Sequence, residues 1–204
     1  MKSMLLIGGG GHCHSCIDVI EEANSFQIAG VVQPKESSEL ILGYPVIGSD
    51  EDLPQLLRGV KSALVTVGQI KTPQVRIRLF DLLKQLNAEL PVVVSPSAYC
   101  SKHSEMGKGS IVMHGAIANA GAKVGANCIV NSQALVEHDV KIDDHCHIST
   151  GAQVNGGVTI GKGSFVGSGA VIKEGVRLGE NVIVGAGQIV LRDLPNGTVV
   201  KNAD

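Results

Sequence analysis

A histidine between two acids, Glu137-His138-Asp139, is the strongest candidate for chemistry in this chain. One carboxylate can accept a hydrogen bond from Nδ1–H, which leaves Nε2 free to take a proton from a substrate. His138 lies two residues after the apolar Val136, so we expect it to point outward near a corner. An exposed histidine without a role is the alternative. We predict that His138 is a general base oriented by a neighbouring acid.

Four glycines and a histidine, residues 8–12, follow the apolar run 4–7. Such a turn lets backbone N–H groups approach a phosphate at the start of a helix, where the dipole favours negative charge. The dinucleotide pattern is only partly met, because Cys13 stands where the third glycine belongs. Gln33 stands where an acid would bind a ribose. The turn predicts a nucleotide or sugar-nucleotide site rather than one for NAD, with a purely structural turn as the alternative.

The run His12-Cys13-His14-Ser15-Cys16 has the composition of a metal cluster. A structural zinc site needs four ligands, and no second pair follows at a suitable spacing. Cys13 and Cys16 lie one helical turn apart and are expected to face the packing side of a helix. We predict no metal site here, and we expect His12 to point at whatever the turn binds.

A six-residue period positions the second half of the chain. Every sixth residue from Val94 to Val190 is apolar and mostly branched, and a series of mostly small residues from Ala98 to Val182 runs four residues behind. Helices need apolar spacings of three and four, and a meander would interrupt the period with hairpins. The strict hexad predicts a parallel β-helix in which each coil buries its interior by stacking on its neighbours.

The period also orients the polar run 143–147. Cys146, like Cys128, belongs to the small inward series, so neither thiol is predicted to be a nucleophile. His147 precedes an inward residue and is expected to face outward. His138 and His147 are half a coil apart if three hexads make one turn. They are then expected on different faces of one subunit, and they could meet only across an interface in a closed oligomer.

Two stretches rich in glycine complete the candidates. In Asn155-Gly156-Gly157 the backbone N–H groups are open to an acyl oxygen, as in an oxyanion hole, or the segment is a simple bend. Residues 167–169 and 185–187 are all small and could admit an extended ligand or form tight corners.

Residues 1–92 are expected to form a separate α/β domain, and residues 93–204 the β-helix. Strands are predicted at 4–7, 28–32 and 63–67, and helices at 15–23 and 75–86. A strand, a glycine turn, a helix and a strand are the start of a doubly wound, Rossmann-like unit.

Composition narrows the class of protein. The 204 residues carry a formal net charge of −2, which does not indicate nucleic acid or a membrane surface as a partner. No signal peptide or membrane span is visible, and five cysteines without a secretory context predict reduced thiols in the cytoplasm. The lack of Trp and the 26 glycines fit a solenoid with a narrow aliphatic core.

On these residues the chain resembles the left-handed β-helix acyltransferases. Within them it is similar to the sugar acetyltransferases that include UDP-4-amino-sugar N-acetyltransferases and sialic acid O-acetyltransferases, the PglD/NeuD-like group. The hexads carry the broad resemblance, and the glycine turn paired with the Glu-His-acid run carries the narrower one. It covers nearly the whole chain, including residues 43–48, Val67-Gly68 with Arg76, 96–98, Asn131, 147–149, 151–152, Gly156 and 184–187.

The resemblance implies a Rossmann-like α/β domain followed by an all-β left-handed helix, a homotrimer, and acetyl-CoA between neighbouring β-helices. It implies direct transfer with His138 as general base and Asp139 raising its basicity. The implied contacts with acetyl-CoA come from Asn131, His147, Gly156, Ser168 and Ala186. The implied contacts with the nucleotide sugar come from Gly10, Gly11, His12, Gln33, Pro34 and Gly68.

The implied activity is N-acetylation of a UDP-type 4-amino sugar for bacterial surface glycans. O-acetylation of a sialic-acid-like sugar is an alternative, because the same base serves an amine or a hydroxyl. Another is a non-catalytic β-helix protein, or one that binds zinc through His138, His145 and His147 of neighbouring subunits. The chain departs from the family at Gln33-Pro34, where Asp is frequent, at Asp139, where Glu is more usual, and at Lys201-Asn202-Ala203, where Gly-x-Pro-Ala is usual.

Overall fold

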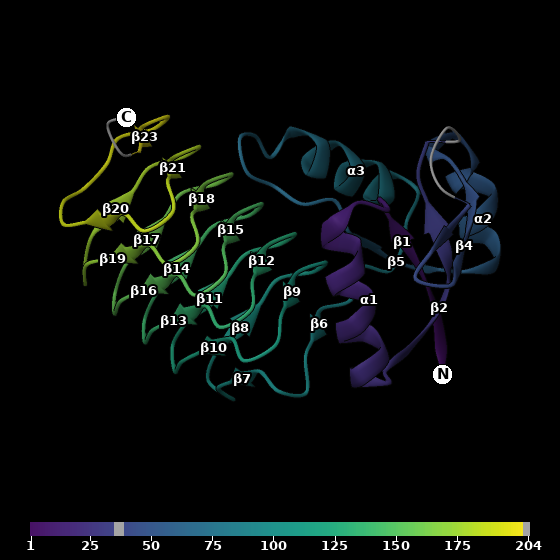
Figure 1. Ribbon diagram of the computed structural model, residues 1–204, viewed down its shortest axis with the longest axis horizontal. Helices are drawn as coiled ribbons and strands as arrows, with labels where there is room; N and C mark the ends of the chain where they lie inside the picture. Colours follow the sequence, from purple (N-terminus) through teal and green to yellow (C-terminus); the bar gives the residue numbers. More distant parts are fainter. Residues whose placement is uncertain (35–38, 202–204) are drawn as a thin grey trace.

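The computed structural model describes residues 1–34 and 39–201. Its N-terminal part is a five-stranded sheet in the order β3-β4-β2-β1-β5, with helices on both faces (Figure 1). Strands β1 and β2 and strands β1 and β5 pair in parallel, as strands joined by helical crossovers do. The strands are β1 (Lys2–Ile7), β2 (Phe26–Val32), β3 (Leu40–Ile41), β4 (Tyr44–Gly48) and β5 (Ser62–Val65).

Alternate residues of β1 face opposite layers of helices. Met4 and Leu6 pack in one cluster with helix α1 (Gly11–Ala23). Leu5 and Ile7 pack in another with α2 (Leu53–Gly59), which follows the 3₁₀ turn η1 (Asp50–Asp52), and with α3 (Gln74–Gln85). Because side chains alternate along a strand, a continuous apolar run becomes buried on both faces. The predicted α/β unit is confirmed.

Several features of this part differ from the prediction, among them helix α2 and the η1 turn, which were not predicted. Helix α1 begins at Gly11, so His12 and His14 already belong to it, whereas the sequence predicted a start at residue 15. The hairpin of β3 and β4 was not predicted. Its turn places Leu42 at a φ of 46° and Gly43 at a φ of 87°, and a leucine is unusual at a left-handed position where Asn or Gly is the common signal. No helix among the described residues is long and apolar enough to cross a bilayer.

The rest of the chain winds into a parallel β-helix of two-residue strands in three sheets (Figure 1). The β6 sheet contains β6 (Val93–Val94), β9 (Ile111–Val112), β12 (Ile129–Val130), β15 (His147–Ile148), β18 (Phe165–Val166), β21 (Ile183–Val184) and β23 (Val199–Val200). The β7 sheet contains β7 (Tyr99–Cys100), β10 (Ile117–Ala118), β13 (Leu135–Val136), β16 (Gln153–Val154), β19 (Val171–Ile172) and β22 (Ile189–Val190). The β8 sheet contains β8 (Glu105–Met106), β11 (Lys123–Val124), β14 (Lys141–Ile142), β17 (Thr159–Ile160) and β20 (Arg177–Leu178).

The hexad prediction is confirmed in register and in burial. Ile117 lies beside Leu135, eighteen residues later, and His147 lies beside Phe165. The branched series from Val112 to Val190 forms one buried core, and Val94, Cys100 and Met106 pack against its first end. The coils stack so closely that a Cβ on Gly161 would lie 2.5 Å from the carbonyl carbon of Gly179.

The second residue of each strand points into the core, and the first points outward. Each sheet therefore presents one outward side chain per coil. Charged residues predominate on the β8 sheet: Glu105, Lys123, Lys141, Thr159 and Arg177. Apolar residues predominate on the β7 sheet, and all are at least partly exposed: Tyr99, Ile117, Leu135, Gln153, Val171 and Ile189. The β6 sheet has its first outward residues covered, because Val93, Ile111 and Ile129 pack in the cluster of α1.

The burial pattern predicts the result of adding a charge to the core. Val154 is fully buried and the preceding Gln153 is exposed. Val154→Asp would leave a carboxylate in the core without a partner, so we expect loss of the folded protein, whereas Gln153→Asp should fold normally. Circular dichroism and size-exclusion chromatography of the two variants measure this. A folded, soluble Val154→Asp protein would contradict the register.

Candidate functional site

A cavity of about 1120 Å³ lies where the N-terminal part meets the β6 sheet. Its wall combines the glycine turn, the end of β2, the loop after β5, and the later coils of the β-helix. The lining residues include Gly10, Gly11, His12, Gln33, Pro34, Gly68, Gln69, Asn131, His147, Ser168 and Ala186. Ten of the thirteen residues proposed for catalysis and binding are therefore brought to one place.

The glycine turn leaves the start of α1 open to a ligand. A Cβ on Gly10 or Gly11 would meet no atom within 4 Å, so the backbone there faces free space. Gly10 is the N-cap and makes no side-chain capping bond, and the first turn of α1 holds no acidic residue. The first N–H groups of a helix have no partner within it, and the helix dipole makes this end attractive to anions.

Gly8 has a different task in the same turn. Its φ of 108° is left-handed, and a Cβ there would lie 2.4 Å from the side chain of Val67. Its N–H donates to Val32 O at 2.8 Å, and Thr66 Oγ1 donates to Gly8 O at 2.6 Å. Only glycine fits this junction of β1, β2 and β5. Gly8 is thus structural, and Gly10 and Gly11 are the accessible members of the turn.

His147 is buried in the wall of the cavity in a defined tautomer. Its Nδ1 lies 2.7 Å from Gln69 O, a carbonyl that can only accept, so Nδ1 carries the proton. Its Nε2 then accepts from Asn131 Nδ2 at 3.1 Å, and Asn131 Oδ1 accepts from the N–H of Ser132 at 2.8 Å. Burial lowers the pKa of His147 to about 4, against the raising effect of the bond to Gln69 O. The imidazole is therefore neutral.

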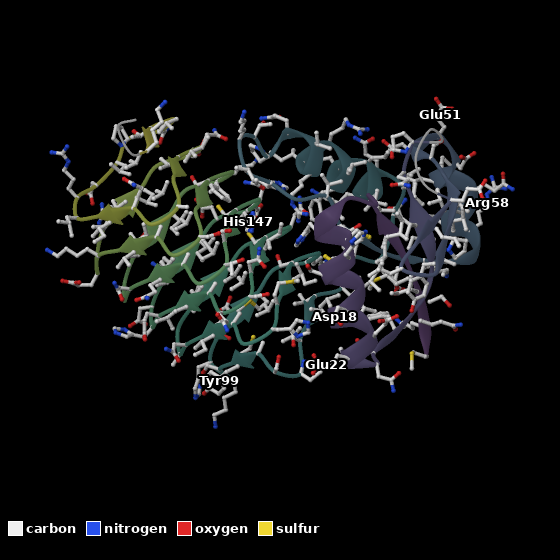
Figure 2. All side chains as sticks on the ribbon, viewed as in Figure 1. Asp18, Glu22, Glu51, Arg58, Tyr99 and His147 are labelled. Atoms are coloured by element: carbon white, nitrogen blue, oxygen red, sulfur yellow. The ribbon has the colours of Figure 1, made fainter. Side chains whose placement is uncertain are left out.

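The predicted outward direction of His147 is correct with respect to the coil, yet the side chain is only 6% exposed. The loop after β5 covers it, an arrangement that the hexad period could not reveal. Figure 2 shows His147 on the β-helix where it faces the N-terminal part. Its ring lies 5.2 Å from the Phe165 ring and 6.3 Å from that of His12, between centroids.

His12 lines the cavity as predicted. Burial, together with the nearby positive charge of Arg76, lowers the pKa of His12 to about 3. Its Nε2 atom is buried, and no described residue forms a hydrogen bond with it. The side chain is a neutral ring with one polar atom left for another partner.

His138 and Asp139 form a second group on an exposed corner between the β7 and β8 sheets. The Nδ1 atom of His138 lies 3.0 Å from Asp139 Oδ2, and the side chain is 65% exposed. This hydrogen bond raises the pKa of His138 above its usual value. Glu137 Oε2 accepts the backbone N–H of His138 at 3.0 Å. The arrangement is the one predicted: an acid fixes the Nδ1 proton, and Nε2 points away from it.

Gly156 lies directly beneath this histidine. A Cβ on Gly156 would lie 2.6 Å from His138 Nε2, so glycine leaves the space that the ring occupies. The N–H of the next residue, Gly157, donates to His138 O at 2.9 Å, and Gly157 has a left-handed φ of 67°. The N–H of Gly157 is therefore occupied in the turn and is not available to an acyl oxygen.

Within one chain the two groups stand on different corners, as predicted for His138 and His147. The His138–Asp139 pair and Gly156 lie between the β7 and β8 sheets. The cavity lies along the β6 sheet and its corner with the β7 sheet, where Asn131, Ser168 and Ala186 are found. Of the departures from the family pattern, Gln33-Pro34 lines the cavity, and Asn202-Ala203 lies outside the described residues.

The thiols take no part in the site. Cys13 and Cys16 are fully buried on the packing side of α1, as predicted, and burial raises the pKa of both. Burial also raises the pKa of Cys146. In the part of the chain that the structure describes, no group of three His, Cys, Asp or Glu side chains could hold a metal ion. His145 forms a hydrogen bond with Asn127 and packs edge-on against Phe80 of α3, and it lies on a different corner of the coil from His138.

Two sets of polar contacts join the N-terminal part to the β-helix. Arg76 of α3 donates to Asn127 O at 3.1 Å and to Asn127 Oδ1 at 2.8 Å, and Gln69 Nε2 donates to Gly163 O at 3.3 Å. His114 lies 3.0 Å from both Asp18 and Glu22, the two acids labelled on α1 in Figure 2. These contacts fix the cavity between the two parts.

No role for Arg76 was predicted from the sequence. A signal was present, because Arg76 occupies the apolar stripe of α3 with Leu79, Phe80 and Leu83, at helical spacing. A charged residue at such a position is buried and must find polar partners. Gln69 and Asn127 gave no comparable signal.

Parallel coils with an outward histidine–acid pair, joined to an α/β unit with a glycine turn, define a hexapeptide-repeat acyltransferase. A model of the PglD N-terminal domain matches residues 3–83. A model of the bacterial transferase hexapeptide (six repeats) matches residues 139–174, and one of the hexapeptide repeat of succinyl-transferase matches residues 157–192. A comparison with curated sequences finds no significant match.

Solved structures narrow the class to a family. The perosamine N-acetyltransferase PerB from Caulobacter crescentus, determined with CoA and GDP-perosamine, is 32% identical with a TM-score of 0.91, over 98% of this chain and 93% of that one. The acetyltransferase domain of PglB from Neisseria gonorrhoeae is 29% identical with a TM-score of 0.92, over 98% and 96%. The chain belongs to the PglD/NeuD-like family of sugar acetyltransferases, and its β-helix is left-handed as in these neighbours.

The two buried histidines predict how stability depends on pH. In the unfolded chain their pKa is the ordinary 6.5, whereas in the fold it is about 3 for His12 and about 4 for His147. The unfolded state therefore binds more protons below pH 6.5. The free energy of unfolding should be full above that pH and fall toward pH 4 by about 1 kcal/mol per pH unit for each histidine.

Urea denaturation across this pH range tests the assignment. His147→Gln should reduce the slope of stability against pH, and His14→Gln on the exposed face of α1 serves as the matched control. An unchanged slope in His147→Gln would show that this histidine is charged in the fold.

Proposed function

We propose that the protein is an acetyl-CoA-dependent N-acetyltransferase that acts on the 4-amino group of a nucleotide-linked sugar of the UDP type. The observation that carries the proposal is the pairing of an open glycine turn in a large cavity with an exposed histidine held by an acid. The neighbour PerB, determined with CoA and GDP-perosamine, supports the two substrate classes. The five free cysteines fit a cytoplasmic enzyme.

In this proposal, residues 1–92 are the nucleotide-sugar domain and residues 93–204 the acetyltransferase domain. The diphosphate lies at the start of α1, where Gly10 and Gly11 leave room and offer N–H groups. His12, Gln33, Pro34 and Gly68 surround the nucleotide. Acetyl-CoA takes the small-residue surface of the later coils, with contacts from Asn131, His147, Gly156, Ser168 and Ala186.

The catalytic pair and the cavity belong to one active site only if a second subunit supplies one of them. The outward side of the β7 sheet gives a reason for such an assembly, because Tyr99, Ile117, Leu135, Val171 and Ile189 form an apolar stripe along it that only Gln153 interrupts. Contiguous exposed apolar surface is typical of interfaces, and a closed symmetric ring places the same corner of one subunit beside the same cavity of the next. We propose a homotrimer with its active sites between subunits.

The chemistry of this chain is general-base catalysis of direct transfer. Asp139 accepts a hydrogen bond from the Nδ1–H of His138 and holds the ring, so His138 Nε2 is the basic atom. Nε2 accepts a proton from the sugar amine while the amine nitrogen bonds to the acetyl carbon. The bond from that carbon to sulfur then breaks, and the imidazolium can return its proton to the leaving thiolate.

A thiol-release assay with acetyl-CoA tests the activity directly. The acceptors are UDP- and GDP-linked 4-amino sugars, together with free and CMP-linked sialic acids. Turnover with the UDP-linked amino sugar is the expected result. Turnover with sialic acids alone would replace it by the alternative O-acetylation, and silence on all acceptors would contradict the proposal.

The role of His138 predicts a change in rate and in pH profile. His138→Ala should lower turnover on the order of 100-fold or more while acetyl-CoA still binds. Asp139→Asn removes the main cause of the raised pKa of His138, so the acid limb of the rate profile should move to lower pH. Measurement of kcat from pH 5 to 9 tests both predictions. An acid limb that does not shift in Asp139→Asn would show that Asp139 does not tune the pKa of His138.

The trimer predicts that the two outward faces respond differently to charge. Leu135 on the β7 sheet and Thr159 on the β8 sheet are both outward and half-buried. Leu135→Lys should dissociate the trimer and abolish turnover, and Thr159→Lys should do neither. Analytical ultracentrifugation measures the mass, and a trimeric Leu135→Lys protein would place the interface elsewhere.

A further inference from the structure

The lining of the cavity is uncharged, although the proposed substrate is an anion. Of the described residues that line it, none carries a formal charge near neutral pH, since His12 and His147 are neutral. The nucleotide diphosphate of the proposed substrate carries at least two negative charges. An anion that leaves water needs compensating charge, or its transfer is costly. The start of α1 offers only a partial charge.

A full positive charge lies directly behind this wall. Arg76 is 1% exposed, and its Nη1 donates to Val65 O at 2.9 Å and to Val67 O at 2.6 Å. Val67 itself lines the cavity, and Gly68 and Gln69 continue the wall. The other donor, Nη2, bonds the oxygens of Asn127.

All these partners of Arg76 are neutral. Within residues 1–34 and 39–201 no carboxylate lies in ion-pair distance of the guanidinium, and Nε has no hydrogen-bond partner. Arg76 also stands in the first turn of α3, where the helix dipole opposes a cation. A buried, uncompensated charge in an unfavourable position costs stability, which makes a purely structural role a poor explanation.

We propose that Arg76 supplies, through the wall formed by Val67 and Gln69, the positive charge that holds the anionic diphosphate in the cavity. The inference rests on the proposed function, since it names the group that binds the phosphates of that substrate. Arg76 does not touch the ligand. It is a positioning residue. Its charge acts through the closely packed, low-dielectric interior between α3 and the β-helix, where it is poorly screened.

The two histidines that line the cavity indicate that the potential of Arg76 extends into it. The positive charge of Arg76 contributes, after burial, to the lowered pKa of both His12 and His147. Both rings line the cavity, so the same potential that disfavours a proton on them favours an anion beside them. The remaining titratable groups near Arg76 are the buried Cys16 and Cys128 thiols and His145, whose pKa is lowered chiefly by burial.

The alternative is that Arg76 only ties α3 to the β-helix. The two roles differ in how the loss of the charge affects ligands of different charge. A structural defect weakens all ligands of the cavity alike, whereas loss of the potential weakens them in proportion to their negative charge. Uridine, UMP and UDP share a nucleoside and form such a series.

The test measures the affinity of the three probes by isothermal titration calorimetry for the full chain and three variants. Arg76→Gln removes the charge, and Arg76→Lys keeps it. Asn127→Asp keeps the arginine but places a carboxylate at the oxygen that is 2.8 Å from Nη2. It is close in shape to Asn127 and leaves no cavity, although it exchanges the Nδ2 donor to His145 Nδ1 and Arg76 O for a second carboxylate oxygen. This variant keeps the test valid if Arg76→Gln does not fold.

We expect Arg76→Gln and Asn127→Asp to bind uridine almost as the wild type does. They should lose affinity on the order of tenfold for each unit of ligand charge, as one buried charge at intermediate effective dielectric predicts. Arg76→Lys should retain most of the increase in affinity from uridine to UDP. Equal losses for uridine and UDP would overturn the role of Arg76 while leaving the nucleotide site intact. A wild type that binds none of the probes would overturn the UDP-type site, and Arg76 would lose its ligand with it.

Discussion

Each coil of the β-helix depends on backbone hydrogen bonds to the coils before and after it. The N–H of Ile129 donates to Cys146 O at 2.9 Å, and the N–H of His147 donates to Ser164 O at 3.0 Å, in one continuous ladder. The ladder holds residues that are eighteen apart side by side. The position of a side chain within the coil therefore decides whether it lies in the core, on the apolar face, on the charged face or toward the N-terminal part.

The β6 sheet shows how this constraint produces a site. Its first outward residues, Val93, Ile111 and Ile129, pack under α1, and the next two, His147 and Phe165, line the cavity. The shift from covered to cavity-lining residues occurs where the loop after β5 meets the coils. At this place the Arg76 guanidinium bonds Asn127, and His147 Nδ1 bonds Gln69 O. A repetitive scaffold thus becomes specific at the few coils where the N-terminal part ends.

Much of this arrangement could be predicted from the sequence because the hexad is a strictly local code. The inward series, the eighteen-residue coil, the outward His138 and the α/β unit all follow from spacing alone. The burial of His147 could not be predicted, because it depends on how the loop after β5 lies on the coils. The same holds for Gln69 and Asn127, whose partners are distant in the chain. The hairpin after β2 was missed because Leu42 occupies a turn position that glycine or asparagine usually marks.

The central claim is that the cavity of one subunit works with His138 of another, and a mixed trimer tests it most directly. His138→Ala removes the base, and Gly10→Trp fills the cavity from a position where a Cβ meets no atom within 4 Å. Each protein alone should be inactive. After the two are unfolded together and refolded at equal amounts, random closed trimers should recover about a quarter of the wild-type turnover, because that share of interfaces joins an intact cavity to an intact base. No recovery from well-folded mixed trimers would show that cavity and base act within one chain, and would contradict the account.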